Sequence, residues 1–434
     1  MSRSAKTTSA IALFIALSLL LCSCGVFVSY ELKIPDSVDK DDINDLPDPE
    51  KVTPDTVETI DFGFTDTFDP TKMLSLLHKY NFGFDYITIA MDIEDCAMFT
   101  HSELYIDSGI YERNSALEDT FSFKFSKINE DADTLLKNIK SASGSSENYA
   151  DILAISLGEA YKLEEANLLT DLTGLPFIST NQDYFSESAD LGLDSVYLLA
   201  GSASYLPSQT RVLFFNRSEL KKLEKSSPYS LITSKKWTWD ALLTYLSEDA
   251  TLSTEQDLAS LIGATVRNGD EIKKAKAKEL AESFSALSVT EKAKESFLSG
   301  TSLFYLGTFA DLTDFMDPEN PVGIMPLPIF EEGDSYSNIR LASEVTVFAC
   351  PKNSSDIERS AFLISAINAA SNDYIESVFC RISKNGMLSD NGSQLSLGHI
   401  YSADTVIIYP EGHPKAPVTE EEPEDTETEE KEKT

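Results

Sequence analysis

The sequence has few of the residues that catalytic and metal sites most often use. Its 434 residues include four histidines and five cysteines, and no two cysteines form a CxxC pair. It also lacks an HExxH pair, a G-x-S-x-G elbow, a Walker A loop and a G-x-G-x-x-G fingerprint. One S-x-x-K pattern, at residues 218–221, falls at the start of a predicted amphipathic helix. We therefore predict no catalytic residue, no metal site and no cofactor.

Basic residues are also scarce. The chain has 35 lysines and arginines against 72 aspartates and glutamates, which gives a net charge of −37. Nucleic acid and anionic membrane surfaces bind basic faces, so both are disfavoured as partners. Residues 420–434 alone hold nine acidic residues and two lysines. Such a run buries no apolar area, so we predict a disordered acidic tail over residues 409–434, which either solubilises the chain or makes a specific acidic contact.

The apolar stretch at residues 11–21, IALFIALSLLL, is too short to span a bilayer, which takes about 20 residues. It follows the basic residues Arg3 and Lys6, and Ser23 is a small residue just before Cys24. A basic start, a short apolar stretch and a small residue at the end are typical of a secretory signal peptide. We predict a signal peptide over residues 1–23.

The segment Leu21-Cys22-Ser23-Cys24 resembles the bacterial lipobox, whose last cysteine becomes the lipidated first residue of the mature protein. Cys22 departs from the Ala, Ser or Thr usual at its position. The resemblance implies an exported lipoprotein whose Cys24 carries acyl chains such as palmitate, at the outer face of a membrane. Stable anchoring needs two acyl chains. The alternative is ordinary secretion with free cysteines.

Residues 24–56 follow as a flexible tether, because they are rich in Asp and Pro and show neither helical nor strand periodicity. The remaining cysteines are Cys96, Cys350 and Cys380. They allow at most one disulfide, and unpaired core thiols are the commoner outcome. Whether any of them pair stays open at this point.

The folded part shows alternating helix and strand patterns and is long enough for two domains. Residues 110–121 have a helical apolar spacing, and the Phe123 to Phe125 segment alternates as a strand. An amphipathic helix is expected from Asp131, followed by a buried strand at 151–155 and another helix to Glu164. This β-α-β-α order predicts an α/β fold with parallel strand pairing.

Later segments continue the alternation. Residues 212–216, 302–307 and 344–351 are apolar and strand-like. Helical patterns dominate from residue 240 to residue 298 and return from residue 356 to the low 380s. No internal repeat is present.

Several motifs in this order resemble those of the extracellular solute-binding proteins of ABC transporters, the sugar-binding family 1 in particular. They are DILA (151–154), LLTDL (168–172), VLFFNR (212–217), KWTWDAL (236–242), FLSG (297–300), GTF (307–309), VGIMPLP (322–328) and VTVFACPK (345–352). Each motif is weak alone, and their order carries the resemblance. One departure is Thr308-Phe309, since the family often has Trp after the glycine.

The resemblance implies a two-lobed periplasmic-binding-protein-like fold with strands that cross between the lobes. It places the crossings at 213–216, 304–307 and 345–351. Lobe 1 would comprise residues 57–213 plus 303–346, and lobe 2 residues 216–302 plus 347–408. A ligand that contacts both lobes would favour a closed state by its differential affinity.

The function implied is delivery of a small solute, most simply a sugar or oligosaccharide, to an ABC importer. The expected partners are that solute and the permease subunits, with membrane contact through the lipid anchor only. We expect a monomer that catalyses no reaction. The alternatives are a surface sensor or scaffold lipoprotein of the same fold and, with less support, a glycan-acting hydrolase, since 72 acidic residues always allow a carboxylate pair.

Sugar sites combine aromatic platforms with carboxylates and amides. Tyr184 and Phe185 form an apolar pair inside the polar stretch STNQDYFSES, and surface packing of a loop is the alternative. Tyr205 lies in a Gly/Ser loop just before the first expected crossing, where loops of α/β sheets carry sites. All three are candidate ligand-binding residues.

The other candidates are Trp237, Trp239, Phe309, Asp311 and Glu344. The tryptophans open a predicted helix that Thr238 can cap, so burial of both rings is the alternative to stacking on a ligand. The last three residues lie beside the second and third expected crossings.

Overall fold

The computed structural model describes residues 81–93, 96–100, 107–145, 148–179, 184–185, 196–267, 269, 271–315, 321–384, 388 and 390–413. The predicted signal peptide, the lipidation site Cys24, the tether and the tail beyond residue 413 lie outside the described residues. So does the lobe segment that was expected from residue 57 to residue 80.

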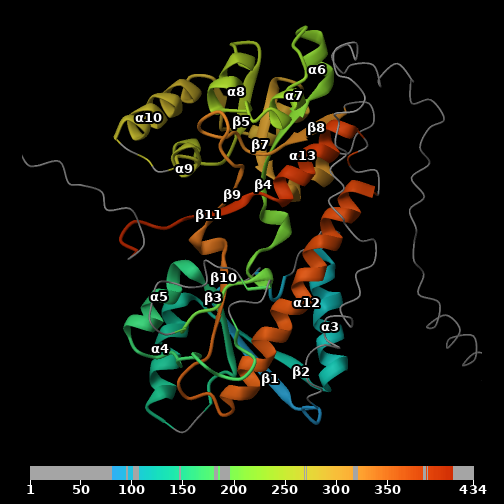
Figure 1. Cartoon of the computed structure of the whole chain (residues 1–434). Helices are drawn as coiled ribbons and strands as arrows, with labels where there is room; N and C mark the ends of the chain where they lie inside the picture. The colour runs from blue at the N-terminus through green and yellow to red at the C-terminus, as the bar shows by residue number, and fades with distance from the viewer. Residues whose placement is uncertain are drawn as a thin grey trace, which may run out of the picture. The chain divides into compact units, whose positions relative to one another are not determined.

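The first sheet is four-stranded, and Figure 1 shows it in the lower half of the view. Its strands, in spatial order, are β10 (Thr346–Ala349), β3 (Ile152–Ser156), β1 (Tyr86–Met91) and β2 (Lys124–Asn129). Strand β1 pairs in parallel with both β2 and β3, whereas β10 runs antiparallel to β3. The predicted α/β class with parallel pairing is confirmed.

Helices cover both faces of this sheet. One face packs against α3 (Gly109–Phe121) and α12 (Ile357–Lys384), which Figure 1 shows side by side. The other packs against α4 (Ala132–Ser143) and α5 (Leu157–Glu165), and we call the cluster on this face the α4–α5 core. All five residues of β3 are buried, as the continuous apolar run predicts.

Helix α4 shows how the local sequence fixes an element. Asp131 is the N-cap, and its carboxylate accepts a hydrogen bond of 3.0 Å from the amide of Thr134. Leu135 and Ile139 stand four residues apart and both are buried, so one stripe of the helix faces the sheet. The helix predicted from Asp131 is confirmed.

The second sheet is five-stranded. Its order is β6 (Ser288–Val289), β5 (Thr251–Thr254), β7 (Ser302–Thr308), β4 (Arg211–Asn216) and β8 (Val322–Met325). Strand β4 is antiparallel to both of its neighbours, and β5 is parallel to β7.

Helices also cover this sheet. They are α6 (Arg217–Lys222), α7 (Tyr229–Thr233), α8 (Trp239–Tyr245), α9 (Leu258–Ala264), α10 (Glu271–Ser285), α11 (Ala293–Leu298) and α13 (Asn391–Tyr401). The cluster on the face that packs against α7 to α10 is called the α8–α10 core below. The opposite face packs against α11 and α13. No helix within the described residues combines the length and apolarity that crossing a bilayer requires.

The sheets divide the chain differently from the expected lobes. The segment at 304–307 does not cross, because β7 pairs with β4 and β5 inside the second sheet. Conversely β10 and the buried part of α12, expected in lobe 2, join the first sheet and its core. The apolar motifs predicted these strands but could not predict their partners, since pairing depends on residues far apart in sequence.

Short elements connect the sheets. They are the 3-10 helices η6 (Ser202–Ser204), η7 (Pro207–Gln209), η8 (Phe309–Phe315) and η9 (Ala342–Glu344), and a two-stranded sheet of β9 (Ser337–Leu341) and β11 (Asp404–Ile408). The chain passes from the first sheet to the second before Arg211 and returns through η9 to β10. The prediction of a tail from residue 409 is wrong for its first residues, because His413 is buried against aromatic rings.

Candidate functional site

The carboxyl ends of β1 and β3 form the first part of the site. The chain leaves β1 toward β2 on one side and returns to β3 on the other, so the strand order reverses between β1 and β3. Ligands of open α/β sheets bind outside such a point. Asp92 follows β1, and its carboxylate accepts hydrogen bonds from the Ser156 amide at 2.8 Å and the Ser156 hydroxyl at 2.7 Å.

Burial dominates the electrostatics of Asp92. It raises the pKa of the carboxyl above its ordinary value, while the two hydrogen bonds from Ser156 act in the opposite direction. The nearby Glu159 carboxylate raises the pKa further. Asp92 is therefore a carboxylate whose ionisation the protein disfavours, at the edge where a ligand of this fold class would bind.

A backbone contact connects this edge to the segment through which the chain returns from the second sheet. The amide of Leu157 donates to the carbonyl of Val345 at 2.8 Å. The adjacent Glu344 forms a bidentate ion pair with Arg211, with Nη1 and Nη2 at 2.7 and 2.8 Å from its two oxygens. Because Arg211 opens β4, this pair joins two of the segments that cross between the sheets.

Arg211 has further partners. Its Nε donates to Gln256 Oε1 at 2.9 Å and its Nη1 to the carbonyl of Ile339 at 3.1 Å. The guanidinium side chain is only 3% exposed, whereas that of Glu344 is 21% exposed. The pair is thus largely desolvated and held by additional hydrogen bonds.

A second buried arginine, Arg340, lies beside the pair. It donates to the carbonyl of Leu206 at 3.2 Å and to Thr210 Oγ1 at 2.7 Å, and its guanidinium lies 5.7 Å from the centre of the Tyr205 ring. Burial lowers the pKa of Arg340 to about 10, and the Glu344 charge opposes that change. Two guanidinium groups and one carboxylate thus lie together where the chain crosses between the sheets, and we call this group of residues, with Tyr205 and Gln209, the junction.

Two polar oxygens at the junction have no hydrogen-bond partner within the described part of the chain. They are the hydroxyl of Tyr205 and Oε1 of Gln209, and both atoms are buried. Gln209 ends η7, which packs against η8. A buried oxygen without a partner costs about 1–3 kcal/mol. A ligand hydroxyl that donates to either oxygen would recover part of that cost.

No protein-family model and no curated protein matches the chain. Among solved structures, UspC from M. tuberculosis is similar, with a TM-score of 0.51 and 11% identity over 74% of this chain and 89% of that protein. The sugar-binding protein MalE from Xanthomonas citri is similar, with a TM-score of 0.50 and 13% identity over 74% of this chain and 86% of that protein. The chain shares its fold with these two proteins. The two-lobed fold that the sequence motifs implied is confirmed.

This fold brings four of the predicted site residues to the junction, since Tyr205, Phe309, Asp311 and Glu344 lie on or next to η6, η8 and η9. Tyr205 and Glu344 both lie close to Arg340. The backbone amide of Phe309 donates to the carbonyl of Thr210 at 3.0 Å, but its ring is buried.

Asp311 is engaged within the protein. Its carboxylate accepts from the Thr308 amide at 2.8 Å and lies 2.5 Å from Lys294 Nζ. Burial would lower the pKa of Lys294, but hydrogen bonds to Asp311 and Asp314 raise it above its ordinary value. Asp311 therefore holds η8 in place, and it has less capacity left for a ligand than Gln209.

The two tryptophans lie in the α8–α10 core with no exposed surface. Trp237 Nε1 donates to the carbonyl of Pro326 at 3.0 Å, and Trp239 Nε1 donates to Thr265 Oγ1 at 3.0 Å. Both rings are thus packed and hydrogen-bonded. Burial, the alternative to stacking on a ligand, is what the structure shows for both.

Tyr184 and Phe185 lie against the first sheet rather than at the junction. Their rings are 4.9 Å apart, and Phe185 is buried in the core beside α12. The Tyr184 carbonyl accepts from the Ser202 amide at 2.9 Å. A Cβ on Gly201 would lie 2.3 Å from that same carbonyl oxygen, so glycine is required for this approach. The pair anchors η6, which carries Tyr205 at its end.

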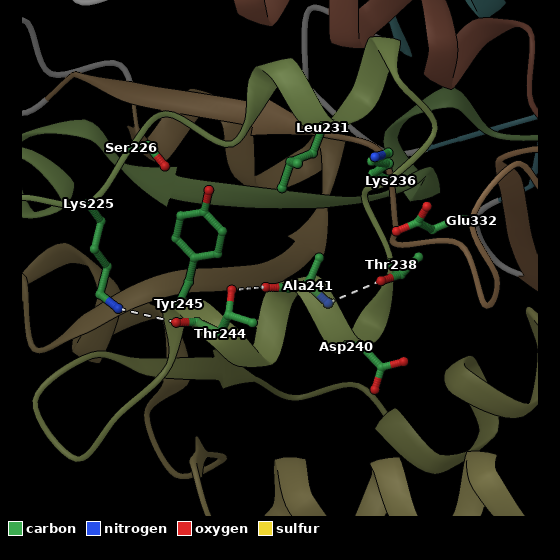
Figure 2. Close-up of a pocket in the computed structure, with 10 residues that line it drawn as sticks. All are labelled: Lys225, Ser226, Leu231, Lys236, Thr238, Asp240, Ala241, Thr244, Tyr245 and Glu332. Carbon is green, nitrogen blue, oxygen red and sulfur yellow. Dashed lines mark hydrogen bonds between the residues drawn. The ribbon is translucent and has the colours of Figure 1, made fainter. Parts of the chain in front are cut away.

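Figure 2 shows a pocket of about 540 Å³ on the helices of the second sheet. Lys225 Nζ donates to the Thr244 carbonyl at 3.4 Å, and the Asp240 carboxylate pairs with Lys276 at 2.7 Å. The pocket lining includes none of the buried polar atoms that lack a partner in the described ranges. The junction is therefore the better candidate for recognition of a polar solute.

Sequence reasoning missed the residues that organise the junction, namely Asp92, Gln209, Arg211 and Arg340. A signal was present for the arginines, since Arg211 begins the strand-like apolar run RVLFF and Arg340 interrupts the run IRLA. A charge inside such a run is buried only with partners. Asp92 follows the apolar run YITIAM directly. Cys96 and Cys350 are buried free thiols, and no group of metal-ligating residues occurs among the described residues.

Proposed function

We propose that this protein is a lipid-anchored extracellular solute-binding protein that delivers a sugar or oligosaccharide to an ABC importer. The fold supports a solute-binding role, and one of the similar structures is a sugar-binding protein, MalE. The observation that carries the proposal is the polar junction between the two sheets, where a buried ion pair lies beside two buried oxygen atoms that have no partner among the described residues.

In this proposal the two sheets and their helices are the lobes. One lobe comprises residues 81–206 and 346–371, and the other comprises residues 211–341 and 390–408. The crossings before Arg211 and through η9 act as hinge segments. A solute that contacts both lobes closes them, because its contacts are complete only in the closed state.

The chemistry of the junction suits a neutral polyol better than an anion or a metal ion. A sugar hydroxyl can donate to Tyr205 Oη or Gln209 Oε1 and can accept from a guanidinium. The net charge of the chain is −37, so long-range attraction of anionic solutes is weak. Tyr205, Gln209 and Glu344 are the residues we assign to the sugar, and Asp92 is assigned to the edge of the same site.

The test is calorimetric titration with a panel of neutral mono- and oligosaccharides. Gln209→Ala is expected to weaken binding of the recognised sugar about tenfold, which is the loss of one hydrogen bond to a buried partner. The matched control is Lys236→Ala, an exposed residue that lines the pocket in Figure 2. Loss of affinity in Lys236→Ala with none in Gln209→Ala would place the site at the pocket instead.

The lipid anchor is a separate part of the proposal. We infer that Cys24 carries the diacylglycerol thioether and holds the mature protein at the outer membrane surface. Cys24→Ser should release the protein into the medium and abolish incorporation of labelled palmitate. The control is Cys22→Ser, which leaves the modified sulfur in place and should keep the protein bound to membranes.

A further inference from the structure

The C-terminal strand β11 lies between the two cores. It pairs in parallel with β9 along its whole length, from Asp404 opposite Ser337 to Ile408 opposite Leu341. Val406 and Ile408 pack against the α8–α10 core of the second sheet, whereas Ile407 and Tyr409 pack against the α4–α5 core of the first. Because side chains alternate along a strand, one face of β11 contacts each lobe.

Strand β9 repeats this division. Ile339 is part of the α8–α10 core, and the next residue, Arg340, reaches Leu206 and Thr210 at the crossing into β4. The β9–β11 pair is therefore a two-stranded ribbon whose two faces contact different lobes. Residues 404–408 form one strand of that ribbon, and they lie outside the crossings before β4 and through η9.

Beyond the strand, aromatic contacts fix the chain to the first lobe. The ring of His413 stacks on Tyr409, with centroids 4.5 Å apart and an angle of 29° between the planes. The His413 ring also contacts the ring of Tyr161 on α5, with centroids 4.7 Å apart and an angle of 72° between the planes. His413 is only 6% exposed. A chain segment that extends from the second lobe thus ends in an aromatic cluster on the first.

We propose that residues 404–413 form a latch that holds the two lobes in one relative orientation in the solute-free protein, so that hinge bending has to work against the latch contacts. The crossings before β4 and through η9 can bend. Bending would either break the contacts among Tyr409, His413 and Tyr161 or pull one face of β11 away from the core that it packs against. The latch goes beyond the proposed function and requires no particular solute. Its failure would leave the sugar assignment untouched.

The test measures the distance between the lobes in the full chain by electron-electron double resonance. Spin labels are placed at Lys137→Cys on α4 and Lys278→Cys on α10, both exposed positions. Cys22, Cys24 and Cys380 are replaced by serine, while the buried Cys96 and Cys350 are kept. Without added solute, the native latch should give one narrow distance distribution.

The decisive variants are His413→Ala and Tyr161→Ala, which remove the cluster from opposite sides. Each should increase the population of other lobe arrangements about tenfold, a change of about 1.4 kcal/mol. The double variant should add little, because both act on one contact. His413→Phe retains an aromatic ring and should keep the narrow distribution, which separates loss of the latch from loss of the fold.

The matched control is Tyr86→Ala, an exposed aromatic residue on β1 that is 71% accessible to solvent. It should leave the distribution unchanged. The proposal is overturned if His413→Ala and Tyr161→Ala give the native distribution, if Tyr86→Ala broadens it equally, or if His413→Phe broadens it as much as alanine does.

Discussion

Replacement of Arg211 by methionine tests how much the buried Arg211–Glu344 ion pair contributes to stability. The substitution keeps the apolar stem but removes the guanidinium, which is 3% exposed and pairs with Glu344 at 2.7 Å. It leaves the Glu344 carboxylate and the Ile339 carbonyl without their partner. Removal of one member of a buried ion pair costs about 3–5 kcal/mol.

The structure places this variant at the lower end of that range. Glu344 is 21% exposed and so retains some contact with water. It also keeps the hydrogen bond of 2.9 Å from the Leu341 amide. We therefore expect Arg211→Met to lower the free energy of unfolding by about 3 kcal/mol.

The assay is urea denaturation followed by circular dichroism, with Lys276→Met as control. Lys276 pairs with Asp240 at 2.7 Å, but both side chains are about half exposed, so the control should cost less than about 1 kcal/mol. The double variant Arg211→Met/Glu344→Leu should recover part of the loss, because the carboxylate that loses Arg211 is removed as well, whereas the buried Arg340 guanidinium keeps its two hydrogen bonds but loses the nearby Glu344 charge. A cost for Arg211→Met no larger than that of the control would refute the reasoning.

The remaining predictions concern single side chains. Trp239→Ala removes a buried ring and should lower the free energy of unfolding, measured in urea, by about 3–5 kcal/mol. The sugar affinity measured by calorimetry should stay unchanged. A loss of affinity without a loss of stability would contradict the assignment of Trp239 to the core. Tyr205→Phe removes a buried hydroxyl that has no partner among the described residues, so the ligand-free protein should be at least as stable as the original. Sugar binding should weaken. A lower stability of the variant would argue against an unpaired hydroxyl. Burial, and secondarily the Lys235 charge, lowers the pKa of His399 below its ordinary value of 6.5. As the pH falls, His399 therefore takes up a proton in the unfolded chain before it does so in the folded protein. The free energy of unfolding should decrease as the pH drops through about 6.5. His399→Gln should flatten that decline in the urea midpoint between about pH 7.5 and 5.5, and an unchanged slope would exclude His399 as its source.

The sequence predicted those parts of the fold that depend on local pattern. Helix α4, with its Asp131 cap, and strand β3, with five buried residues, are two of the confirmed elements. The periodicity of apolar residues in one segment is enough for such elements. The alternation of these elements also predicted the α/β class.

Strand partners and the site could not be predicted in this way. A segment as apolar as 304–307 could either cross between the lobes or pair within one sheet. In the structure it pairs within the second sheet. Arg211 and Glu344 are 133 residues apart in sequence, so no local pattern connects them. The sequence predicted Tyr205 and Glu344 from their nearness to expected crossings, while the aromatic character of Trp237, Trp239 and Phe309 reflects core packing.

The most direct test of solute binding by lobe closure is a scattering titration with the neutral oligosaccharide that the calorimetric panel identifies. The account predicts that the radius of gyration falls as sugar is added and saturates with the calorimetric isotherm, because the bound sugar brings the lobes together. Sugar binding with an unchanged radius of gyration at saturation would contradict it.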